Sequence, residues 1–253
     1  MEILKAEHIS LKAKEKFIIK DISFTLEKGD FCCVVGMNGS GKSTLMKCLC
    51  RAVDTSEGNV FIREKNIKKY SVKELAKEVS VVFQSSDINM DFSVLQIVLM
   101  GRLPYQRIFE RDKQEDLLIA EQALRETNTL HLKDRLFPSL SGGEKQRVLI
   151  ARSLCQNTPI MFLDEPIASL DVKHQFEVME LLRRINQEKQ VSILLILHDL
   201  SLALQYSNKV IALKHGEMKQ FGATNNILTK ENIESLFEVK AEITNNNNII
   251  LTH

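Results

Sequence analysis

The sequence predicts an α/β fold in which a parallel core sheet is combined with an N-terminal antiparallel β-layer and an inserted helical subdomain. Runs of consecutive apolar residues indicate strands that are buried on both faces, and these runs alternate with helices, as in a parallel sheet covered on both sides. The strands are expected at residues 31–35, 79–83, 160–163, 191–197 and 210–213. An amphipathic helix is expected between the third and fourth of them, at residues 172–187.

The antiparallel layer is predicted by three segments in which apolar and polar residues alternate, at residues 2–9, 21–26 and 59–62. A short helix is expected at residues 71–78, because Ser71 and Glu74 form a capping-box pattern.

The helical subdomain is predicted by a long stretch with helical periodicity and no convincing strand. Its helices are expected at residues 93–100, 113–127 and 142–155, and in the middle one Leu117, Ala120 and Leu124 line one face. We therefore expect one domain over residues 1–240. Its core comprises residues 1–84 and 156–240, its helical subdomain residues 85–155, and residues 241–253 form a C-terminal tail.

The composition limits the function classes that remain open. With 253 residues and 44% hydrophobic content, the chain can bury a sizeable core. Lysine and arginine total 34 against 33 acidic residues, a net charge of +1, so no polybasic surplus indicates nucleic-acid binding. No apolar run approaches the roughly 20 residues that span a bilayer, so any membrane association is expected to depend on a partner. The five cysteines, an odd number, are expected to be reduced thiols in the core.

The most informative stretch is Gly36-Met37-Asn38-Gly39-Ser40-Gly41-Lys42-Ser43-Thr44, which fits the pattern G-x-x-x-x-G-K-[ST]. A strand before it and a helix after it would aim backbone N–H groups and a helix dipole at one point, which attracts a polyphosphate. The glycines let the backbone approach phosphate oxygens closely. Lys42 is expected at the β- and γ-phosphates of ATP, and the Ser43 hydroxyl on Mg²⁺.

Polar residues follow three other predicted core strands at their carboxyl ends, which is the edge where open α/β sheets bind ligands. They are Gln84, the pair Asp164 and Glu165, and His198. We expect Asp164 to help hold Mg²⁺, Glu165 to act as general base on the attacking water, and His198 to stabilise charge at the γ-phosphate. These residues are expected to converge on one nucleotide.

A second anion site is expected at Leu140-Ser141-Gly142-Gly143-Glu144, where a Ser-Gly-Gly turn opens a helix. This turn lies in the helical subdomain and is not expected to reach the glycine loop of its own chain. Two copies arranged head to tail would place the Ser141 turn of each on the nucleotide held by the other.

Phe17 allows two interpretations that the sequence does not separate. The ring would stack on the adenine of the nucleotide, or it would fill a hydrophobic gap beside the sheet.

Together these motifs resemble the nucleotide-binding subunits of ABC transporters, from about residue 2 to about residue 240. The resemblance implies a P-loop NTPase (RecA-like) core and an ATPase that uses ATP and Mg²⁺. It identifies the 36–44 stretch as Walker A, Gln84 as the Q-loop, residues 140–144 as the signature and Asp171 as part of the D-loop. Residues 160–166 resemble Walker B, with catalytic Glu165, and His198 resembles the switch histidine. The implied catalytic residues are Lys42, Gln84, Glu165 and His198, and the implied metal ligands are Ser43, Gln84 and Asp164. The implied nucleotide-binding residues are Phe17, Gly36, Asn38, Gly39, Ser40, Gly41, Lys42, Ser43, Thr44, Ser141, Gly142, Gly143 and Asp171.

Finer features are similar to one branch of this family, the ATPases of importers for ferric siderophores, haem and cobalamin. They are the tracts at residues 100–105, 170–175 and 197–200. This resemblance implies a homodimer on the cytoplasmic face of the membrane, beneath two permease subunits that an extracytoplasmic binding protein supplies. The permeases would dock beside Gln84 and the 86–104 stretch, where Ile88, Met90 and Phe92 are either groove or core residues.

Two alternatives remain open from the sequence. One is a soluble ABC ATPase of iron–sulfur cluster assembly, against which Lys145-Gln146-Arg147 argues because this tract is transporter-like. The other is the ATPase of a zinc or manganese importer, against which the 171–175 tract argues modestly.

Overall fold

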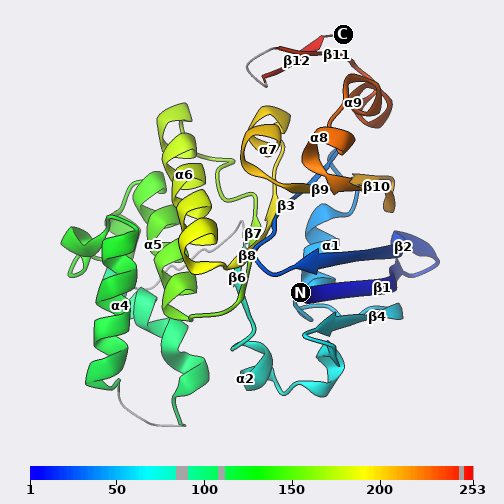
Figure 1. Ribbon diagram of the computed structural model, residues 1–253. Helices are drawn as coiled ribbons and strands as arrows, with labels where there is room; N and C mark the ends of the chain where they lie inside the picture. Colours follow the sequence, from blue (N-terminus) through cyan, green and yellow to red (C-terminus); the bar gives the residue numbers. More distant parts are fainter. Residues whose placement is uncertain (84–90, 108–111, 245–247, 253) are drawn as a thin grey trace. The chain divides into compact units, whose positions relative to one another are not determined.

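The computed structural model describes residues 1–83, 91–107, 112–244 and 248–252 (Figure 1). The chain divides into two compact units, one formed by Met1–Lys69 with Asn186–His253 and the other by Tyr70–Ile185. We describe each unit by itself.

The first unit is built on a mixed sheet with the strand order β5-β4-β1-β2-β10-β9-β3-β8. The bounds of its strands are β1 Glu2–Ala13, β2 Lys16–Glu27, β3 Phe31–Gly36, β4 Glu57–Ile62, β5 Lys65–Asn66, β8 Ser192–Ile196, β9 Lys209–Lys214 and β10 Glu217–Ala223. β3 pairs in parallel with both β8 and β9, and every residue of β3 and β8 is buried. The predicted parallel core strands are thus confirmed for this unit.

The predicted antiparallel layer is also confirmed, because β1 pairs antiparallel with both β2 and β4. The two long strands continue further than the alternation indicated and are joined by a tight turn, in which Lys14 has a left-handed φ of 54°. Phe17, which falls between the predicted segments at residues 2–9 and 21–26, therefore lies within β2, opposite Lys12. Cross-strand hydrogen bonds extend β1 and β2 through this charged stretch although it lacks the apolar alternation of a half-buried strand.

Helices and a small hairpin complete the first unit. They are α1 Lys42–Leu49, η1 Ile67–Lys69, α7 Leu200–Tyr206, α8 Thr224–Ile227, α9 Lys230–Phe237, β11 Lys240–Ile243 and β12 Ile249–Thr252. The β11–β12 hairpin is fixed by two hydrogen bonds: the N–H of Ile249 donates to Ser201 Oγ at 2.9 Å and the N–H of Ala241 to Glu234 Oε1 at 3.0 Å. Residues 245–247 of the expected C-terminal tail lie outside the described residues.

The second unit combines two parallel strands with helices. Its elements are α2 Val72–Leu75, β6 Val79–Val82, α3 Val94–Leu99, η2 Met100–Tyr105, α4 Gln114–Glu126, η3 Leu130–Leu132, η4 Phe137–Ser139, α5 Gly142–Cys155, β7 Ile160–Asp164 and the larger part of α6 Val172–Lys189. β6 and β7 pair in parallel, and α2 begins with the predicted capping box of Ser71 and Glu74. Among the described residues between 91 and 155 there are helices, turns and one isolated bridge, as the helical periodicity predicted.

A buried ion pair organises the helices of this unit. Arg102 Nε donates to Asp116 Oδ1 at 2.8 Å and its Nη1 to the carbonyl of Cys155 at 2.9 Å, with both charged side chains less than one-tenth exposed. Of the three residues predicted to line one face of α4, Leu117, next to the buried Asp116, is 38% exposed and lies outside the buried part of the helix. Ala120 and Leu124 are fully buried, as expected.

Candidate functional site

The glycine loop joins β3 to α1 in the first unit. Lys42 is 6% exposed, and its Nζ donates to the carbonyl oxygens of Gly36 at 2.9 Å and Met37 at 3.0 Å. These bonds draw the ammonium into the curve of the loop, at the N-terminus of an eight-residue helix whose dipole is positive there. Asn38 lies in the turn of the same loop, and Ser43 and Thr44 lie in the first turn of α1.

Two glycines of the loop are required by close neighbours. A Cβ at Gly36 would lie 2.2 Å from the carbonyl oxygen of Leu213, and a Cβ at Gly41 would lie 2.7 Å from Ile19 Cγ2. Gly41 also has a left-handed φ of 97° as the N-cap of α1, a conformation that side chains rarely adopt. The tight curve that results aims backbone N–H groups inward, which suits phosphate oxygens.

The Ser40 hydroxyl provides a second indication of a ligand. Its side chain is only 3% exposed, and its Oγ has no hydrogen-bonding partner among the described residues. A buried hydroxyl without a partner is unfavourable unless a bound group satisfies it. The loop therefore fits a polyphosphate on its own geometry.

The aromatic candidate lies on the strand that packs against this loop. Phe17 is half-buried, and Lys12 Nζ lies 4.4 Å from the centre of its ring. The turn at Gly216 links strand and loop, because its N–H donates to the Ser40 carbonyl at 3.2 Å and its carbonyl accepts from Lys20 N–H at 2.8 Å. Phe17 is thus fixed near the loop, although the choice between stacking on adenine and filling a gap stays a prediction.

His198 lies at the same sheet edge as the glycine loop, in the first unit. Val34 of β3 pairs with Ile196 of β8, so the next-but-one residues along these parallel strands are Gly36 and His198. His198 is exposed, and the following Asp199 caps α7 by accepting the N–H of Leu202 at 3.0 Å. The histidine is therefore anchored between a core strand and a capped helix.

The acidic pair lies at the carboxyl end of β7 in the second unit. All five residues of β7 are buried, and Asp164, its last residue, is 5% exposed. Glu165 follows with a left-handed φ of 50°, which turns the backbone sharply at the end of the strand. Gln84, which follows the parallel strand β6, lies outside the described residues.

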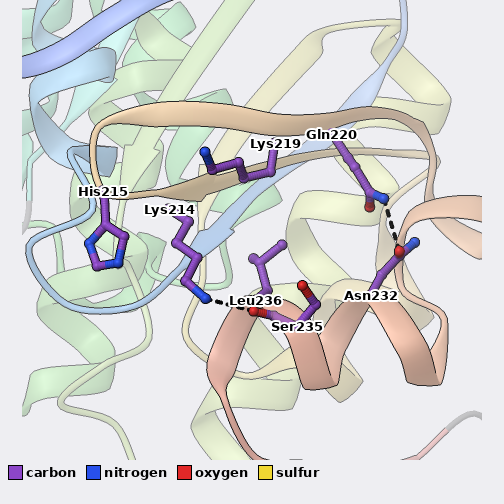
Figure 2. A pocket seen from close by; sticks show the side chains of 7 residues that line it. All are labelled: Lys214, His215, Lys219, Gln220, Asn232, Ser235 and Leu236. Atoms are coloured by element: carbon purple, nitrogen blue, oxygen red, sulfur yellow. Dashed lines mark hydrogen bonds between the residues drawn. The ribbon is translucent and has the colours of Figure 1, made fainter.

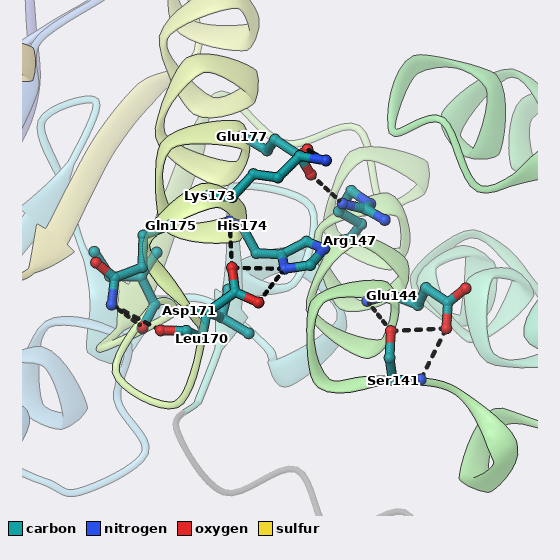
Figure 3. Close-up of polar contacts among 10 residues, drawn as sticks. Ser141, Glu144, Arg147, Leu170, Asp171, Lys173, His174, Gln175 and Glu177 are labelled. Atoms are coloured by element: carbon teal, nitrogen blue, oxygen red, sulfur yellow. Dashed lines mark hydrogen bonds and ion pairs between the residues drawn. The ribbon is translucent and has the colours of Figure 1, made fainter.

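The Ser-Gly-Gly turn opens α5 as predicted. The Ser141 hydroxyl accepts the N–H of Glu144 at 3.4 Å, while Glu144 Oε2 accepts from the Ser141 N–H and hydroxyl at 2.8 Å each (Figure 3). These bonds, the one from the backbone N–H first, hold the pKa of the Glu144 carboxyl below its usual value. The capping box thereby orders the turn whose N–H groups were predicted to receive an anion.

Asp171 caps the next helix and reaches the signature turn through His174. The Asp171 carboxylate accepts the backbone N–H of His174 at 3.0 Å, and His174 Nδ1 lies 2.8 Å from both of its oxygens (Figure 3). These contacts, the backbone bond first, lower the pKa of Asp171. The sequence singled out His174 only as part of the 170–175 tract, although its spacing of three from an N-cap aspartate is a signal for such a pair.

A magnesium site would draw on few protein ligands. Among the residues that the structure describes, no group of three or more His, Cys, Asp and Glu side chains is able to hold a metal ion. Mg²⁺ is usually bound through one or two carboxylates together with substrate phosphates. Phe92, the described member of the expected permease groove, is partly buried, whereas Ile88 and Met90 lie outside the described residues.

No described helix is long and apolar enough to cross a membrane.

A pocket with a volume of about 400 Å³ lies between the β9–β10 hairpin and α9, and none of the predicted site residues lines it (Figure 2). Two lysines line it, but Lys214 pairs with Glu238 at 2.9 Å and Lys219 with Glu217 at 2.6 Å. Because these charges are balanced, the pocket has no electrostatic preference for a phosphate.

Comparison with known proteins gives a consistent result. The family model described as "ABC transporter" matches residues 19–168. The chain is 35% identical to the iron(3+)-hydroxamate import ATP-binding protein FhuC of Bacillus subtilis (strain 168), over 96% of this chain and 90% of that protein. It is 35% identical to the ferric enterobactin transport ATP-binding protein FepC of Escherichia coli (strain K12), over 95% and 89%. It is 31% identical to the hemin import ATP-binding protein HmuV of Pseudoalteromonas translucida (strain TAC 125), over 99% and 98%.

Solved structures agree in fold with this chain. A chain from an inward-facing ABC transporter described as of the metal-chelate type matches with a TM-score of 0.88 and 30% identity, covering 100% of this chain and 98% of that one. A dimeric post-hydrolysis cassette bound to ADP and Pi matches with a TM-score of 0.76 and 26% identity, covering 88% and 99%. The predicted fold class is thereby confirmed.

Proposed function

Because the chain belongs to the ABC transporter family as an ATP-hydrolysing cassette, we propose that it powers the import of an iron chelate (a ferric siderophore), haem or cobalamin through a partner membrane permease. The observation that carries this proposal is the near full-length similarity to proteins named for iron-hydroxamate, enterobactin and hemin import. The relatives named above are described neither as iron–sulfur assembly proteins nor as zinc or manganese importers, so both alternatives receive no support from them.

ATP binds with its phosphates in the 36–44 loop and its base beside Phe17. The partnerless Ser40 hydroxyl and the glycine cradle support this placement. Lys42 contacts the β- and γ-phosphates as a point charge, and the N-terminus of α1 adds its dipole. Ser43, Gln84 and Asp164 would hold Mg²⁺, which would neutralise charge on the phosphates.

Hydrolysis follows from the residues at the strand ends. Glu165 accepts a proton as water attacks the γ-phosphorus, and the bond to the β–γ bridging oxygen breaks to release ADP and phosphate. His198 donates a hydrogen bond to the γ-phosphate, while Gln84 positions the water and the metal. The fixed place of His198 beside Gly36 supports its role.

The active form is a pair of copies that enclose two nucleotides. The signature residues Ser141, Gly142 and Gly143, with Asp171, contact the nucleotide bound by the other copy. Support comes from the ordered Ser141 cap and from the matched cassette solved as a dimer with ADP and Pi. ATP binds the closed pair better than the open pair, so loading and hydrolysis alternate the two states.

The pair associates with the cytoplasmic face of the membrane through permease subunits, which dock beside Gln84 and the 86–104 stretch. An extracytoplasmic binding protein delivers the cargo to the permease and does not touch this chain. The domains implied by this arrangement are the core, residues 1–84 and 156–240, and the helical subdomain, residues 85–155.

Uptake assays test the proposal directly. In a strain that lacks the gene, uptake of radiolabelled ferric hydroxamate, ferric catecholate, haem and cobalamin is measured with and without the wild-type protein. We expect the wild type to restore uptake of one of these cargos and the Lys42→Ala variant to restore none. Affinity purification in mild detergent provides a second readout, since a permease is expected to co-purify. Normal uptake of all four cargos in the deletion strain, with soluble scaffold proteins as the purified partners, contradicts the proposal.

A further inference from the structure

The two glycines of the signature turn have different surroundings. A Cβ added at Gly142 would lie 3.7 Å from Leu170 Cδ2, an ordinary contact distance, whereas a Cβ at Gly143 would lie 2.9 Å from His174 Cδ2 and 3.1 Å from His174 Cγ. Both glycines lie in α5, where alanine is favoured over glycine. The described residues of this chain therefore require a glycine at 143 but not at 142.

The imidazole that limits Gly143 is held in place by Asp171. An ionised carboxylate only accepts hydrogen bonds, so Nδ1 carries the proton and donates it towards both oxygens at 2.8 Å. The Asp171 carboxylate is in turn fixed by the backbone N–H of His174 at 3.0 Å. A shift of the ring away from Gly143 would strain the bond to Asp171 that Figure 3 shows.

A second contact ties the same two helices one turn further along. Arg147 of α5 donates from Nη1 to Glu177 Oε2 of α6 at 2.8 Å. This ion pair fixes the distance between the helices but touches neither the signature turn nor Asp171. The ring of His174, by contrast, lies against Gly143 of the signature turn and is bonded to Asp171.

We infer that His174 is a positioning residue whose imidazole holds the Gly143 turn and the Asp171 carboxylate in a fixed relation, so that both are presented to the second copy as one rigid surface. This inference rests on the proposed function, in which Ser141, Gly142, Gly143 and Asp171 all meet the nucleotide of the partner copy. It assigns different roles to the two glycines. The missing side chain at Gly143 leaves room for the His174 ring of the same chain. The missing side chain at Gly142 leaves room for the nucleotide bound by the partner copy.

Compensating substitutions test the steric part. Gly143→Ala forces the ring aside, so its kcat for ATP is expected to fall at least tenfold. The Gly143→Ala/His174→Ala double variant is expected to recover to the activity of His174→Ala alone, because the obstructing ring is gone. Gly142→Ala is the matched control: His174→Ala is expected to give no recovery there, since the described side chains leave that position open. Equal losses in Gly143→Ala with and without the histidine overturn the inference.

The hydrogen bond is tested separately. His174→Ala is expected to lower kcat several-fold, with the affinity for a fluorescent ATP analogue unchanged because the 36–44 loop is untouched. His174→Asn is expected to retain more activity, since its amide N–H occupies the place of Nδ1–H and can donate to Asp171. Lys173→Ala, 80% exposed on the same helix, is the neighbouring control and is expected to hydrolyse ATP normally. Thermal unfolding of every variant establishes that it is folded.

Two results separate this inference from the proposed function. If the wild type hydrolyses ATP and the Glu165→Gln variant forms an ATP-dependent dimer, the proposed function stands. If His174→Ala then dimerises and turns over like the wild type, or if Glu177→Gln reproduces its whole effect, the positioning role of His174 is wrong. If the wild type shows no ATPase activity and the Glu165→Gln variant forms no ATP-dependent dimer, the proposed function is contradicted instead.

Discussion

The backbone N–H of Leu197 donates to the carbonyl oxygen of Val34 at 3.3 Å, which continues the parallel pairing of β8 with β3 to the edge of the sheet. Gly36 and His198, the residues at the two strand ends, thereby lie beside one another in the first unit. The glycine loop and His198 are far apart in the sequence, but the pairing of β3 with β8 brings them together. His198 therefore follows a rigid element of the core.

Replacement of His198 by alanine is expected to slow hydrolysis by about 100-fold while leaving ATP binding nearly unchanged, because the lost hydrogen bond acts mainly on the charge that develops as the γ-phosphate transfers. Single-turnover ATPase assays and binding of a fluorescent ATP analogue measure the two effects separately. A loss of affinity as large as the loss of rate would place His198 in ground-state binding instead.

Replacement of Lys42 by alanine is expected to weaken ATP binding by about 10- to 100-fold, since a hydrogen bond from a charged donor contributes about 1.5–3 kcal/mol. Its present bonds to the Gly36 and Met37 carbonyls show that the ammonium reaches the centre of the loop. Isothermal titration with ATP and with AMP makes the measurement. AMP lacks the β- and γ-phosphates and is expected to lose little affinity, and an equal loss for both nucleotides contradicts the contact assigned to Lys42.

Replacement of Glu165 by glutamine is expected to reduce kcat by about 10²- to 10⁴-fold, the usual contribution of a general base, with ATP binding retained. The variant should then accumulate as an ATP-bound dimer, which light scattering detects. If the Glu165→Gln variant turns over ATP at the wild-type rate, Glu165 is not the general base.

The Arg102–Asp116 pair predicts a stability effect in the second unit. Asp116→Ala leaves a buried guanidinium unpaired and is expected to destabilise the fold by about 3–5 kcal/mol, whereas removing both charges together should cost less. A double-mutant cycle of denaturant unfolding with Asp116→Leu and Arg102→Met makes this comparison. If the losses of unfolding free energy in the two single variants add up to the loss in the double variant, the two side chains are not coupled.

The same pair predicts the direction of a pH effect. Burial works to raise the pKa of Asp116, but hydrogen bonds from Arg102 and Lys113 outweigh it, and the pKa lies below its ordinary value of 3.8. A carboxyl group whose pKa is lower in the folded state contributes its stability above the unfolded pKa and loses it as the pH falls through the folded pKa. The difference in unfolding free energy between wild type and Asp116→Asn should therefore be full at pH 6 and shrink below about pH 4. A difference that grows on acidification contradicts this assignment.

The thiols are predicted to be unreactive in the folded protein. Burial raises the pKa of Cys33 and of Cys155 to about 12 and that of Cys48 to about 11, so very little thiolate forms at neutral pH. Ellman's reagent should react slowly with the native chain and release five equivalents in denaturant. Cys50, which is partly exposed, should react first, so Cys50→Ser should remove the fastest phase. If the fast phase persists in Cys50→Ser, another cysteine is the one that reacts first.

Local sequence patterns were sufficient for the core strands, since β3, β7 and β8 are buried throughout and almost entirely apolar, and a parallel sheet buries both faces of such strands. They were insufficient at the β1–β2 hairpin, where cross-strand pairing extends both strands through charged residues and places Phe17 on β2. They were also insufficient at Leu117, because the inward turn of Asp116 is set by Arg102, a residue on another element. Tertiary partners decided both cases.

The candidate site shows the same division. The glycine loop and the Ser141 cap are determined by neighbouring residues, so their local geometry could be predicted from spacing alone. The reason for a glycine at 143 could not be predicted, because it depends on a ring on a different helix. The left-handed backbone of Glu165 likewise carries no signal in the residue type. The predicted meeting of Lys42, Gln84, Asp164 and Glu165 at one nucleotide stays a prediction.

The Gly216 turn, which hydrogen-bonds Ser40 on one side and Lys20 on the other, has a consequence for the energetics of loading. The strand that carries the aromatic ring and the loop that curves around the phosphates are fastened together before any nucleotide arrives. Little freedom of motion is then lost in this region on binding, and more of the interaction free energy remains available for drawing two copies together. A variant that loosens the turn should accordingly weaken dimer closure more than it weakens the first encounter with ATP.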